Sequence, residues 1–178
     1  AKLALMEWSD AYGDLTTISI HTFERAPQLA AGVSPHMVPI LAADPASRCA
    51  ALLLPEDAIA VLPLYQDISE IQGDETAVSA ALLNEVPYAP SFILALGTDV
   101  DKSIKNVFDI VFLPGLQKPT LAVLFRPHLT WTGNLSRERD TVRVCIVTLD
   151  ATVSRFPLTL TSEPLPYDCL YLRACPPS

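Results

Sequence analysis

The sequence predicts an all-β fold: a partial β-propeller with about two full four-stranded antiparallel blades and parts of two flanking blades. One reason is repetition. Residues 41–56 and 112–127 each contain two apolar strands joined by a turn, and FDIVFL at 108–113 shares its pattern with YDCLYL at 167–172. The other reason is composition, because 16 prolines against 6 glycines favour short strands ended by proline over long helices. Repeated antiparallel four-stranded units are the pattern of a propeller.

The first 23 residues are predicted to be the end of a blade, built as a hairpin. Residues 2–8 are apolar at both alternating positions, which is typical of a strand covered on both faces. Residues 15–23 alternate instead, with Ile18 and Ile20 facing one way and polar side chains facing the other. We therefore expect a half-exposed outer strand there, and assign 1–23 to the end of a blade.

Residues 35–96 are predicted to form a second blade, with PED at 55–57 as a tight hairpin turn. An insertion at about 66–90 interrupts this blade. Asp74 could cap a short helix in the insertion, although a mobile segment fits the residues equally well. The four expected strands are 37–44, 49–54, 58–64 and 91–96.

Residues 104–161 are predicted to form a third blade, and residues 167–178 to start the next one. The repeat is longer than the ~40 to 45 residues of a WD40 blade, and a closed propeller needs about four to eight blades. We therefore expect the chain, which does not begin with Met, to be a piece of a longer protein. The expected strands of the third blade are 107–113, 120–125, 141–150 and 154–161.

Charge and cysteine usage narrow the class of protein. The formal net charge is -8, with 12 Lys and Arg against 20 Asp and Glu, which argues against a dedicated nucleic-acid-binding surface. No apolar run approaches the ~18 to 20 residues of a membrane span, so no membrane partner is expected. No CxxC pair suggests zinc, and we expect buried free thiols in a reducing compartment at Cys49, Cys145, Cys169 and Cys175.

Motifs for catalysis or cofactor binding are lacking in the sequence, so we expect no enzyme activity, no cofactor and no metal. GxSxG, Gly-rich phosphate loops and Walker motifs do not occur. Asp99 and Asp101 could seat a cation, but solvated turn carboxylates are the favoured interpretation. The histidines lack ligand spacing; they are His21, His36 and His128.

Asp109 and Asp168 stand at matching places in the two related motifs, FDIV and YDCL. Recurrence at matching repeat positions favours a structural role over paired catalytic carboxylates. The expected role is a hydrogen bond from a neighbouring backbone amide to the carboxylate.

The loop RPHLTWTGNLSRERD at 126–140 is the strongest surface candidate. It concentrates arginines and a tryptophan in an otherwise acidic chain, and these residue types are favoured anchors of protein interfaces. The candidate partner-contact residues are Arg126, Trp131, Arg137 and Arg139. The alternative is that Trp131 packs the loop back onto its own blade.

Several runs resemble the large, propeller-built subunit of the cleavage and polyadenylation specificity factor. The similarity includes the PTL strand at 119–121, the Trp-containing loop with Gly133, and RDT at 139–141, where the next strand begins. It covers essentially the whole chain and would place it in the first propeller of that family. The resembling runs are 1–8, 15–24, 48–64, 107–150 and 162–172.

The resemblance implies a nuclear scaffold without enzymatic activity. Such a platform holds a WD-repeat partner and a zinc-finger partner, which read the polyadenylation hexamer, so that the platform meets pre-mRNA only indirectly. Sister families leave two alternatives, a ubiquitin-ligase adaptor that recruits a cullin and a splicing-complex propeller. A further alternative is a direct RNA-binding propeller that depends on Arg126, Arg137 and Arg139.

Overall fold

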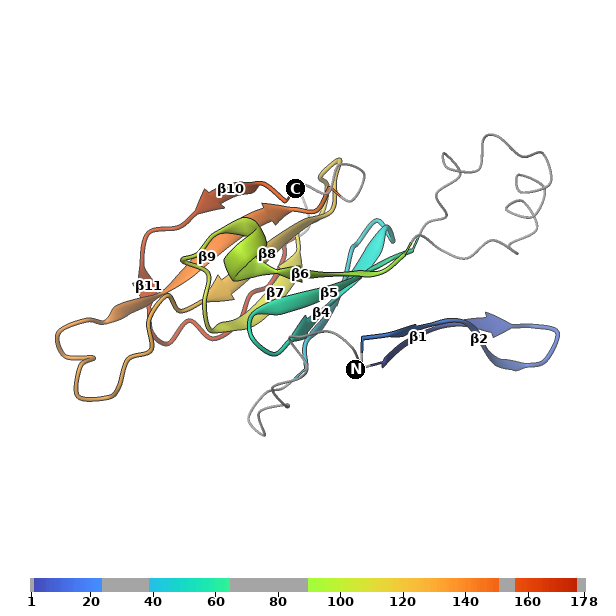
Figure 1. Ribbon diagram of the computed structural model, residues 1–178, viewed down its shortest axis with the longest axis horizontal. Coiled ribbons are helices and arrows are strands. Elements are labelled where there is room, and N and C mark those ends of the chain that lie inside the picture. The colour runs from blue at the N-terminus through green and yellow to red at the C-terminus, as the bar shows by residue number, and fades with distance from the viewer. Residues whose placement is uncertain (1, 24–38, 65–89, 151–155, 176–178) are drawn as a thin grey trace.

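The computed structural model describes residues 2–23, 39–64, 90–150 and 156–175, and it is all-β with antiparallel pairing throughout (Figure 1). A separate hairpin comprises β1 (Lys2–Ser9) and β2 (Asp14–Thr22). The first sheet is a meander of β3 (Leu41–Ala43), β4 (Cys49–Leu54), β5 (Ala58–Pro63) and β6 (Phe92–Ala95). The second sheet is a meander of β7 (Val107–Phe112), β8 (Thr120–Phe125), β9 (Asp140–Thr148) and β10 (Leu158–Thr161), and the short β11 (Leu165–Pro166) also pairs with β9.

These elements confirm the all-β prediction, and neither sheet closes on itself within the described residues. The two meanders lie within the ranges 35–96 and 104–161. Strand β6 ends one residue earlier than expected, because the chain turns at Leu96 into the single π-helical turn η2 (Leu96–Val100). The helix considered at Asp74 and the insertion at about 66–90 lie outside the described residues, apart from the last residue of the insertion.

The middle strands β5 and β8 are apolar at nearly every position, and all twelve of their residues are buried. Such strands must be covered on both faces, because successive side chains point to opposite sides of a sheet. Alternate residues of β5 therefore belong to two different clusters: Ile59 and Val61 to one, Ala58 and Ala60 to the other.

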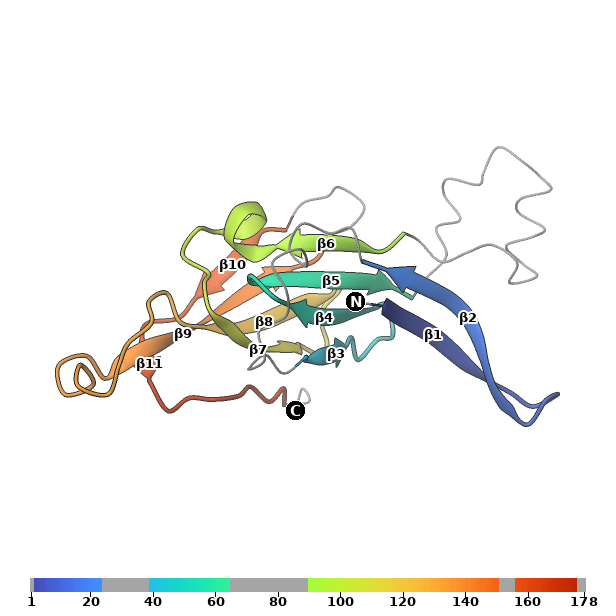
Figure 2. The same ribbon diagram turned by 60° about the horizontal axis from the view of Figure 1, so that its bottom comes forward.

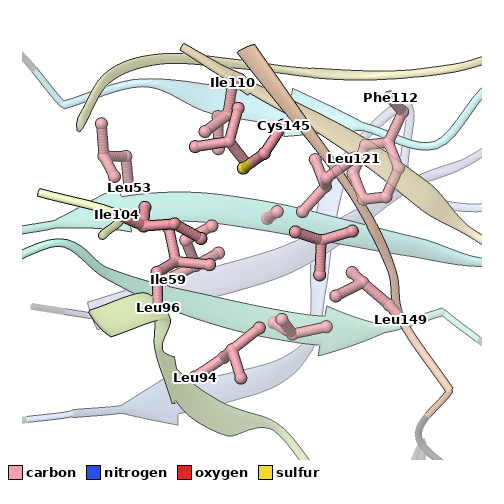
Figure 3. Packing of buried hydrophobic residues seen from close by; sticks show 14 of the residues in the cluster. Leu53, Ile59, Leu94, Leu96, Ile104, Ile110, Phe112, Leu121, Cys145 and Leu149 are labelled. Atoms are coloured by element: carbon pink, nitrogen blue, oxygen red, sulfur yellow. The ribbon is translucent and has the colours of Figure 1, made fainter. Parts of the chain in front are cut away.

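The main core lies between the two sheets, which pack face to face (Figure 3). Leu53 and Ile59 of the first sheet and Ile110, Leu121 and Cys145 of the second point into the same layer. The largest fully buried side chains include Phe112 and Phe125, each at most 1% exposed. Burial of this alternating set fixes the register of both sheets, since a one-residue slip would turn it to solvent.

The opposite face of the first sheet carries the second, smaller cluster. Phe23 and Leu3 from the hairpin end pack there with Leu54, Ala58 and Ala60. The hairpin, the first sheet and the second sheet are thus stacked in sequence order, and the hairpin extends beyond the first sheet (Figure 2).

The expectation that the first strand is covered on both faces is wrong. Only the end of β1 near Leu3 packs against the first sheet, and Met6 and Trp8 farther along are 47% and 59% exposed. The apolar residues at both alternating positions predicted a covered strand, but within the described part of the chain the hairpin pairs with no third strand.

Two sets of hydrogen bonds join the two sheets, one at each end of β4. At one end, the Asp57 carboxylate accepts hydrogen bonds from the backbone amides of Asn106 (2.9 Å) and Val107 (2.7 Å). Asp57 holds this position in the β4–β5 turn with φ +60°, a left-handed conformation that Asp tolerates better than most residues.

At the other end, Arg48 connects the β3–β4 turn to the β7–β8 turn. Its Nε and Nη2 donate to both carboxylate oxygens of Asp44 at 2.6 and 2.9 Å. Its Nη1 donates to the carbonyl oxygens of Leu116 (3.0 Å) and Gln117 (2.6 Å). The Asp44 residue is only 3% exposed, and the Arg48 hydrogen bond holds the pKa of its carboxyl group below the usual range.

The motif YDCLYL at 167–172 does not form a strand, contrary to the prediction. Its sequence pattern matches β7, yet strand formation needs a paired neighbour, and these residues form no ladder with any described strand. A hydrogen bond links the segment to β7, because the Asp109 carboxylate accepts from the backbone amide of Leu172 (2.5 Å). The same carboxylate also accepts from the backbone amide of Ile110 (2.9 Å). The structural role predicted for Asp109 is therefore confirmed.

Candidate partner-contact site

The β8–β9 loop, residues 126–139, projects from one end of the second sheet and is held by its own hydrogen bonds (orange in Figure 1). Asn134 is the centre of this framework. Its amide donates to the Trp131 carbonyl (2.9 Å), and its carbonyl accepts from Arg137 (2.9 Å) and Glu138 (3.0 Å). Its Nδ2 donates to Thr130 Oγ1 (3.4 Å) and to the Glu138 carboxylate (3.2 Å). The loop therefore has a defined backbone path.

Trp131 stands at the outer part of this loop and is 70% exposed. The alternative that it packs the loop back onto the sheet is therefore wrong. A Cβ atom on Gly133 would lie 3.2 Å from the indole Nε1, tighter than most van der Waals contacts. Glycine at this position leaves room for the indole to lie against the loop backbone.

Arg126 differs from the other three candidate residues. Its guanidinium lies 4.6 Å above the Phe108 ring, and Nη2 donates to the Tyr167 carbonyl at 3.3 Å. Its side chain thus joins β7, the foot of the loop and the C-terminal segment. The sequence did not reveal this role, because Phe108 and Tyr167 are remote from Arg126 along the chain.

Arg137 and Arg139 are exposed. Among the described residues neither guanidinium makes a hydrogen bond or an ion pair. The loop therefore carries three exposed candidate side chains, those of Trp131, Arg137 and Arg139. The fourth predicted residue, Arg126, makes contacts within the folded chain and so has a structural role.

A cleft of about 320 Å³ lies at the foot of the loop and another of about 680 Å³ beside it. The larger one separates Leu135 and Ser136 of the loop from the segment 166–168. Its lining also includes Arg139 and Asp140, so that with Asp168 two acidic residues and one arginine line it. The Tyr167 amide donates to the Arg139 carbonyl at 2.9 Å, which fixes the two walls relative to each other.

Sequence reasoning missed several exposed apolar residues in this loop and in the C-terminal segment. Leu129 is 73% exposed, and Tyr167, Leu170 and Tyr171 are 44%, 60% and 71% exposed. The last three belong to the motif YDCLYL, which was predicted to start the next blade. Its aromatic residues could have indicated an exposed apolar surface, but the motif has the same pattern as β7 and was therefore interpreted as the start of a blade.

The remaining polar candidates serve local structure. The Asp99 carboxylate accepts from the Ala95 amide (2.8 Å), and Asp101 accepts from the amide and hydroxyl of Ser103. The Ser103 hydrogen bonds lower the pKa of Asp101. These contacts fit the interpretation as turn carboxylates.

Within the part of the chain that the structure describes, the other histidine and acidic side chains show no metal-binding arrangement. His21 bonds to the hydroxyls of Ser19 and Ser91, and His128 lines the smaller cleft, whereas His36 lies outside the described residues. Over residues 2–23, 39–64, 90–150 and 156–175, no three His, Cys, Asp or Glu side chains are grouped to hold a metal ion. The same ranges contain no helix of the length and apolarity needed to span a membrane.

All four cysteines are free thiols, but only Cys49 and Cys145 are buried; Cys169 is half-buried and Cys175 is exposed. The expectation of four buried thiols is thus correct for two of them. Burial raises the pKa of Cys49 and Cys145 to about 12, and so disfavours the reactive thiolate.

We expect a thiol reagent at pH 8 to modify Cys175 in the folded protein long before Cys49 or Cys145. The physical reason is that the two buried thiols need both access and deprotonation. Iodoacetamide labelling followed by peptide mass spectrometry measures each site, with a urea-unfolded sample as the control in which all four sites react. Equal labelling of Cys145 and Cys175 without urea would contradict the burial of Cys145.

Comparison with known proteins places this chain among relatives that are much longer. No protein-family model matches it. It is 32% identical over 176 residues to "Cleavage and polyadenylation specificity factor subunit 1" of Drosophila melanogaster, a match covering 96% of the chain. It is 33% identical over 169 residues to "Protein cft1" of Schizosaccharomyces pombe, which covers 94% of the chain.

A third relative, "Protein CFT1" of Coccidioides immitis, is 31% identical over 200 residues and matches 99% of the chain. The chain spans only 12% of the length of the first two relatives and 14% of the third. The alignments with these three relatives, from an insect and two fungi, thus cover 94–99% of the chain at 31–33% identity. The chain therefore belongs to the family of the cleavage and polyadenylation specificity factor large subunit, of which it matches one segment.

Proposed function

We propose that this chain is a non-enzymatic scaffold segment of the pre-mRNA 3′-end cleavage and polyadenylation machinery. The observation that carries the proposal is the similarity over 94–99% of the chain to proteins of this family, one of them named as a specificity factor subunit. A subunit of a multi-protein factor needs surfaces for its partners, and the β8–β9 loop supplies an exposed one.

The scaffold is proposed to be part of a β-propeller. Support comes from the stacking of the hairpin, the first meander and the second meander in sequence order, with apolar faces between them. Successive blades of a propeller are four-stranded antiparallel sheets that pack in this way around an axis. On this proposal the blades are 1–23, 35–96, 104–161 and 167–178.

The proposed partners are a WD-repeat subunit and a zinc-finger subunit of the polyadenylation factor, which would contact the pre-mRNA in the nucleus while this chain meets it only indirectly. One feature supports a binding role over catalysis, and another supports an indirect contact with RNA. The carboxylates of Asp57, Asp99, Asp101 and Asp109 accept hydrogen bonds from backbone amides and hydroxyls within the fold. The negative charge of the chain also disfavours extensive direct contact with RNA.

The experiment that tests the scaffold proposal is affinity purification of the full-length protein from nuclear extract, followed by mass spectrometry. We expect WD-repeat and zinc-finger polyadenylation subunits to be recovered. Recovery of a cullin would move the function to a ubiquitin-ligase adaptor, and recovery of splicing subunits to a splicing complex. Either result would overturn the proposal while leaving the fold intact.

We expect the double substitution Trp131→Ala and Arg137→Ala in the full-length protein to lower recovery of at least one partner subunit. The reason is that exposed Trp and Arg side chains are frequent energetic anchors of interfaces, each costing about 1 to 4 kcal/mol of binding when truncated. Quantitative mass spectrometry of the purified complex measures the loss. Leu160→Ala, at a residue of β10 that is 55% exposed, serves as the control, and unchanged recovery of every partner would remove the loop from the interface.

A further inference from the structure

The distal end of the β1–β2 hairpin, residues 7–15, extends beyond the first sheet (Figure 2). Three of its large side chains are aromatic or apolar and exposed, those of Trp8 (59%), Tyr12 (81%) and Leu15 (52%). Three others are exposed carboxylates, those of Glu7, Asp10 and Asp14. We propose that this distal hairpin end docks a basic segment of a protein partner, in which a Lys or Arg side chain stands beside an apolar one. The proposal rests on the proposed scaffold function and names the chemistry of one partner.

The aromatic and acidic side chains of the distal hairpin end are held close together. Trp8 lies directly across from Leu15 in the strand register, and side chains at such paired positions are neighbours on one face of the hairpin. The indole Nε1 of Trp8 also donates a hydrogen bond to the Asp10 carboxylate at 3.0 Å. The folded hairpin therefore places an apolar surface next to a negative charge.

This surface is separate from the contacts that attach the hairpin to the rest of the fold. The apolar cluster between the hairpin and the first sheet includes Leu3 and Phe23, which belong to the opposite end of the hairpin. Among the described residues, the hydrogen bonds made by residues 7–15 all stay within the hairpin. The distal hairpin end therefore has a surface that a partner can contact without displacing part of the described fold.

The charge of the distal hairpin end favours a basic occupant. Residues 3–23 contain three acidic residues and neither Lys nor Arg. The described ion pairs join Arg48 to Asp44 and Lys118 to Asp150, so they do not neutralise these three carboxylates. Guanidinium and ammonium groups form strong hydrogen bonds with carboxylates, and the face of an indole ring attracts the same cations. One Lys or Arg side chain can thus contact both kinds of group.

Two other kinds of occupant are disfavoured by the same charges. The phosphates of RNA would meet three carboxylates with no Lys or Arg beside them in the hairpin. A second copy of this chain, docked through the same surface about a two-fold axis, would bring identical carboxylates together. A basic segment of a different protein avoids both repulsions.

The turn of the hairpin is ordered by its own hydrogen bonds. The Ser9 carbonyl accepts from the backbone amides of Tyr12 (3.3 Å) and Gly13 (2.8 Å). Gly13 has φ +63°, a conformation that glycine adopts without steric cost. The Asp14 carboxylate accepts from the Leu15 amide at 2.7 Å. A surface that is already ordered loses less conformational entropy when a partner binds.

Site-specific photocrosslinking tests the proposal directly. The photoreactive residue p-benzoylphenylalanine replaces Tyr12 in the full-length protein, and the complex is assembled in nuclear extract and irradiated. Digestion with a protease that cuts after Glu keeps Lys and Arg within the crosslinked peptides, which are then sequenced. We expect partner peptides with Lys or Arg beside an apolar residue, and the same replacement at Leu160 should not crosslink to them. Crosslinks to RNA, to an acidic or uncharged segment, to the protein's own chain or a second copy, or to no partner in an intact complex would overturn the proposal.

Charge neutralisation adds a second, independent measurement. Glu7→Gln with Asp10→Asn keeps the size of both side chains and their oxygen acceptors, and should lower recovery of the crosslinked partner at least about threefold at fixed salt. Glu56→Gln with Glu163→Gln changes the net charge equally at exposed residues outside the hairpin, and should have no effect. Equal losses in both double variants would overturn the proposal by showing a general charge effect.

The two experiments also separate this proposal from the proposed function. If the polyadenylation subunits are recovered but the Tyr12 position crosslinks to no basic segment, only the docking proposal fails. If the unmodified protein recovers no polyadenylation subunit, the proposed function fails, and the docking proposal fails with it.

Discussion

Replacing Arg48 with Met is expected to destabilise the protein by about 3 to 5 kcal/mol, a cost typical of leaving one partner of a buried ion pair without the other. The Asp44 carboxylate is inaccessible to solvent, and without the guanidinium it keeps a hydrogen bond only from backbone amides such as that of residue 48 (3.2 Å). The substitution also removes the donors to Leu116 and Gln117, which join the two sheets. Hydrogen exchange of the full-length protein should show faster exchange in β3, β4 and the β7–β8 turn.

The effect of Arg48→Met should depend on pH. In the parent protein the pKa of Asp44 is lowered by its hydrogen bond from Arg48, so the pair contributes stability above the ordinary Asp value of about 3.9 and loses it as pH falls through the lowered pKa. In the variant, burial without a cation favours the neutral acid. The stability difference between parent and variant should therefore shrink between pH 7 and about pH 4.

Two controls separate this effect from a general loss of salt bridges. Lys118→Met removes the ion pair with Asp150, but the lysine side chain is 59% exposed, and exposed pairs contribute only about 0 to 1 kcal/mol. The double variant Asp44→Asn with Arg48→Met should recover part of the lost protection, because no uncompensated charge remains. A variant Arg48→Met that exchanges like the parent at pH 7 would contradict the buried-pair account.

Replacing Asp57 with Ala is expected to destabilise the contact between the sheets by about 2 to 4 kcal/mol, because two backbone amides lose a charged acceptor. Those amides belong to Asn106 and Val107, at the start of β7, and lie 2.9 and 2.7 Å from the Asp57 oxygens. The measurement is amide exchange of residues 104–112 in the full-length protein. Faster exchange there, with the edge strand β10 unchanged, is the expected result.

Matched substitutions at the same position distinguish hydrogen bonding from backbone strain. Asp57 has φ +60°, so Ala adds strain whereas Gly relieves it and Asn tolerates it. If the carboxylate is what matters, Gly should still lose most of the protection, and Asn, which keeps one oxygen acceptor, should lose least. Full protection in Asp57→Gly would instead assign the effect to the turn conformation.

Most strands could be predicted because their signal is local. Residues 49–54 and 120–125 were expected as strands and coincide with β4 and β8, because each is a short apolar run with a proline at one end. The YDCLYL motif has the same local signal as β7 and yet forms no strand. Its conformation depends on whether another strand is available to pair with it, which a local pattern does not contain.

The candidate site was predictable in part for the same reason. Residue types indicated an interface loop at 126–140, and three of its four candidate residues are exposed there. Arg126 was grouped with them because it is adjacent in sequence, but in the folded protein it lies on Phe108 and bonds to Tyr167. Proximity along the chain does not distinguish a side chain that anchors the foot of a loop from one that faces solvent.

The sequence by itself determined the all-β class, most of the strands, the family and the loop that carries the exposed Trp and Arg residues. These depend on residue type and short-range periodicity. Only the tertiary structure decided which carboxylates join the sheets, which arginines remain free and that the β1–β2 hairpin is largely uncovered. These features arise between residues distant in sequence, such as Asp57 with Val107 and Asp109 with Leu172, and long-range contacts of this kind are set by packing rather than by local propensity.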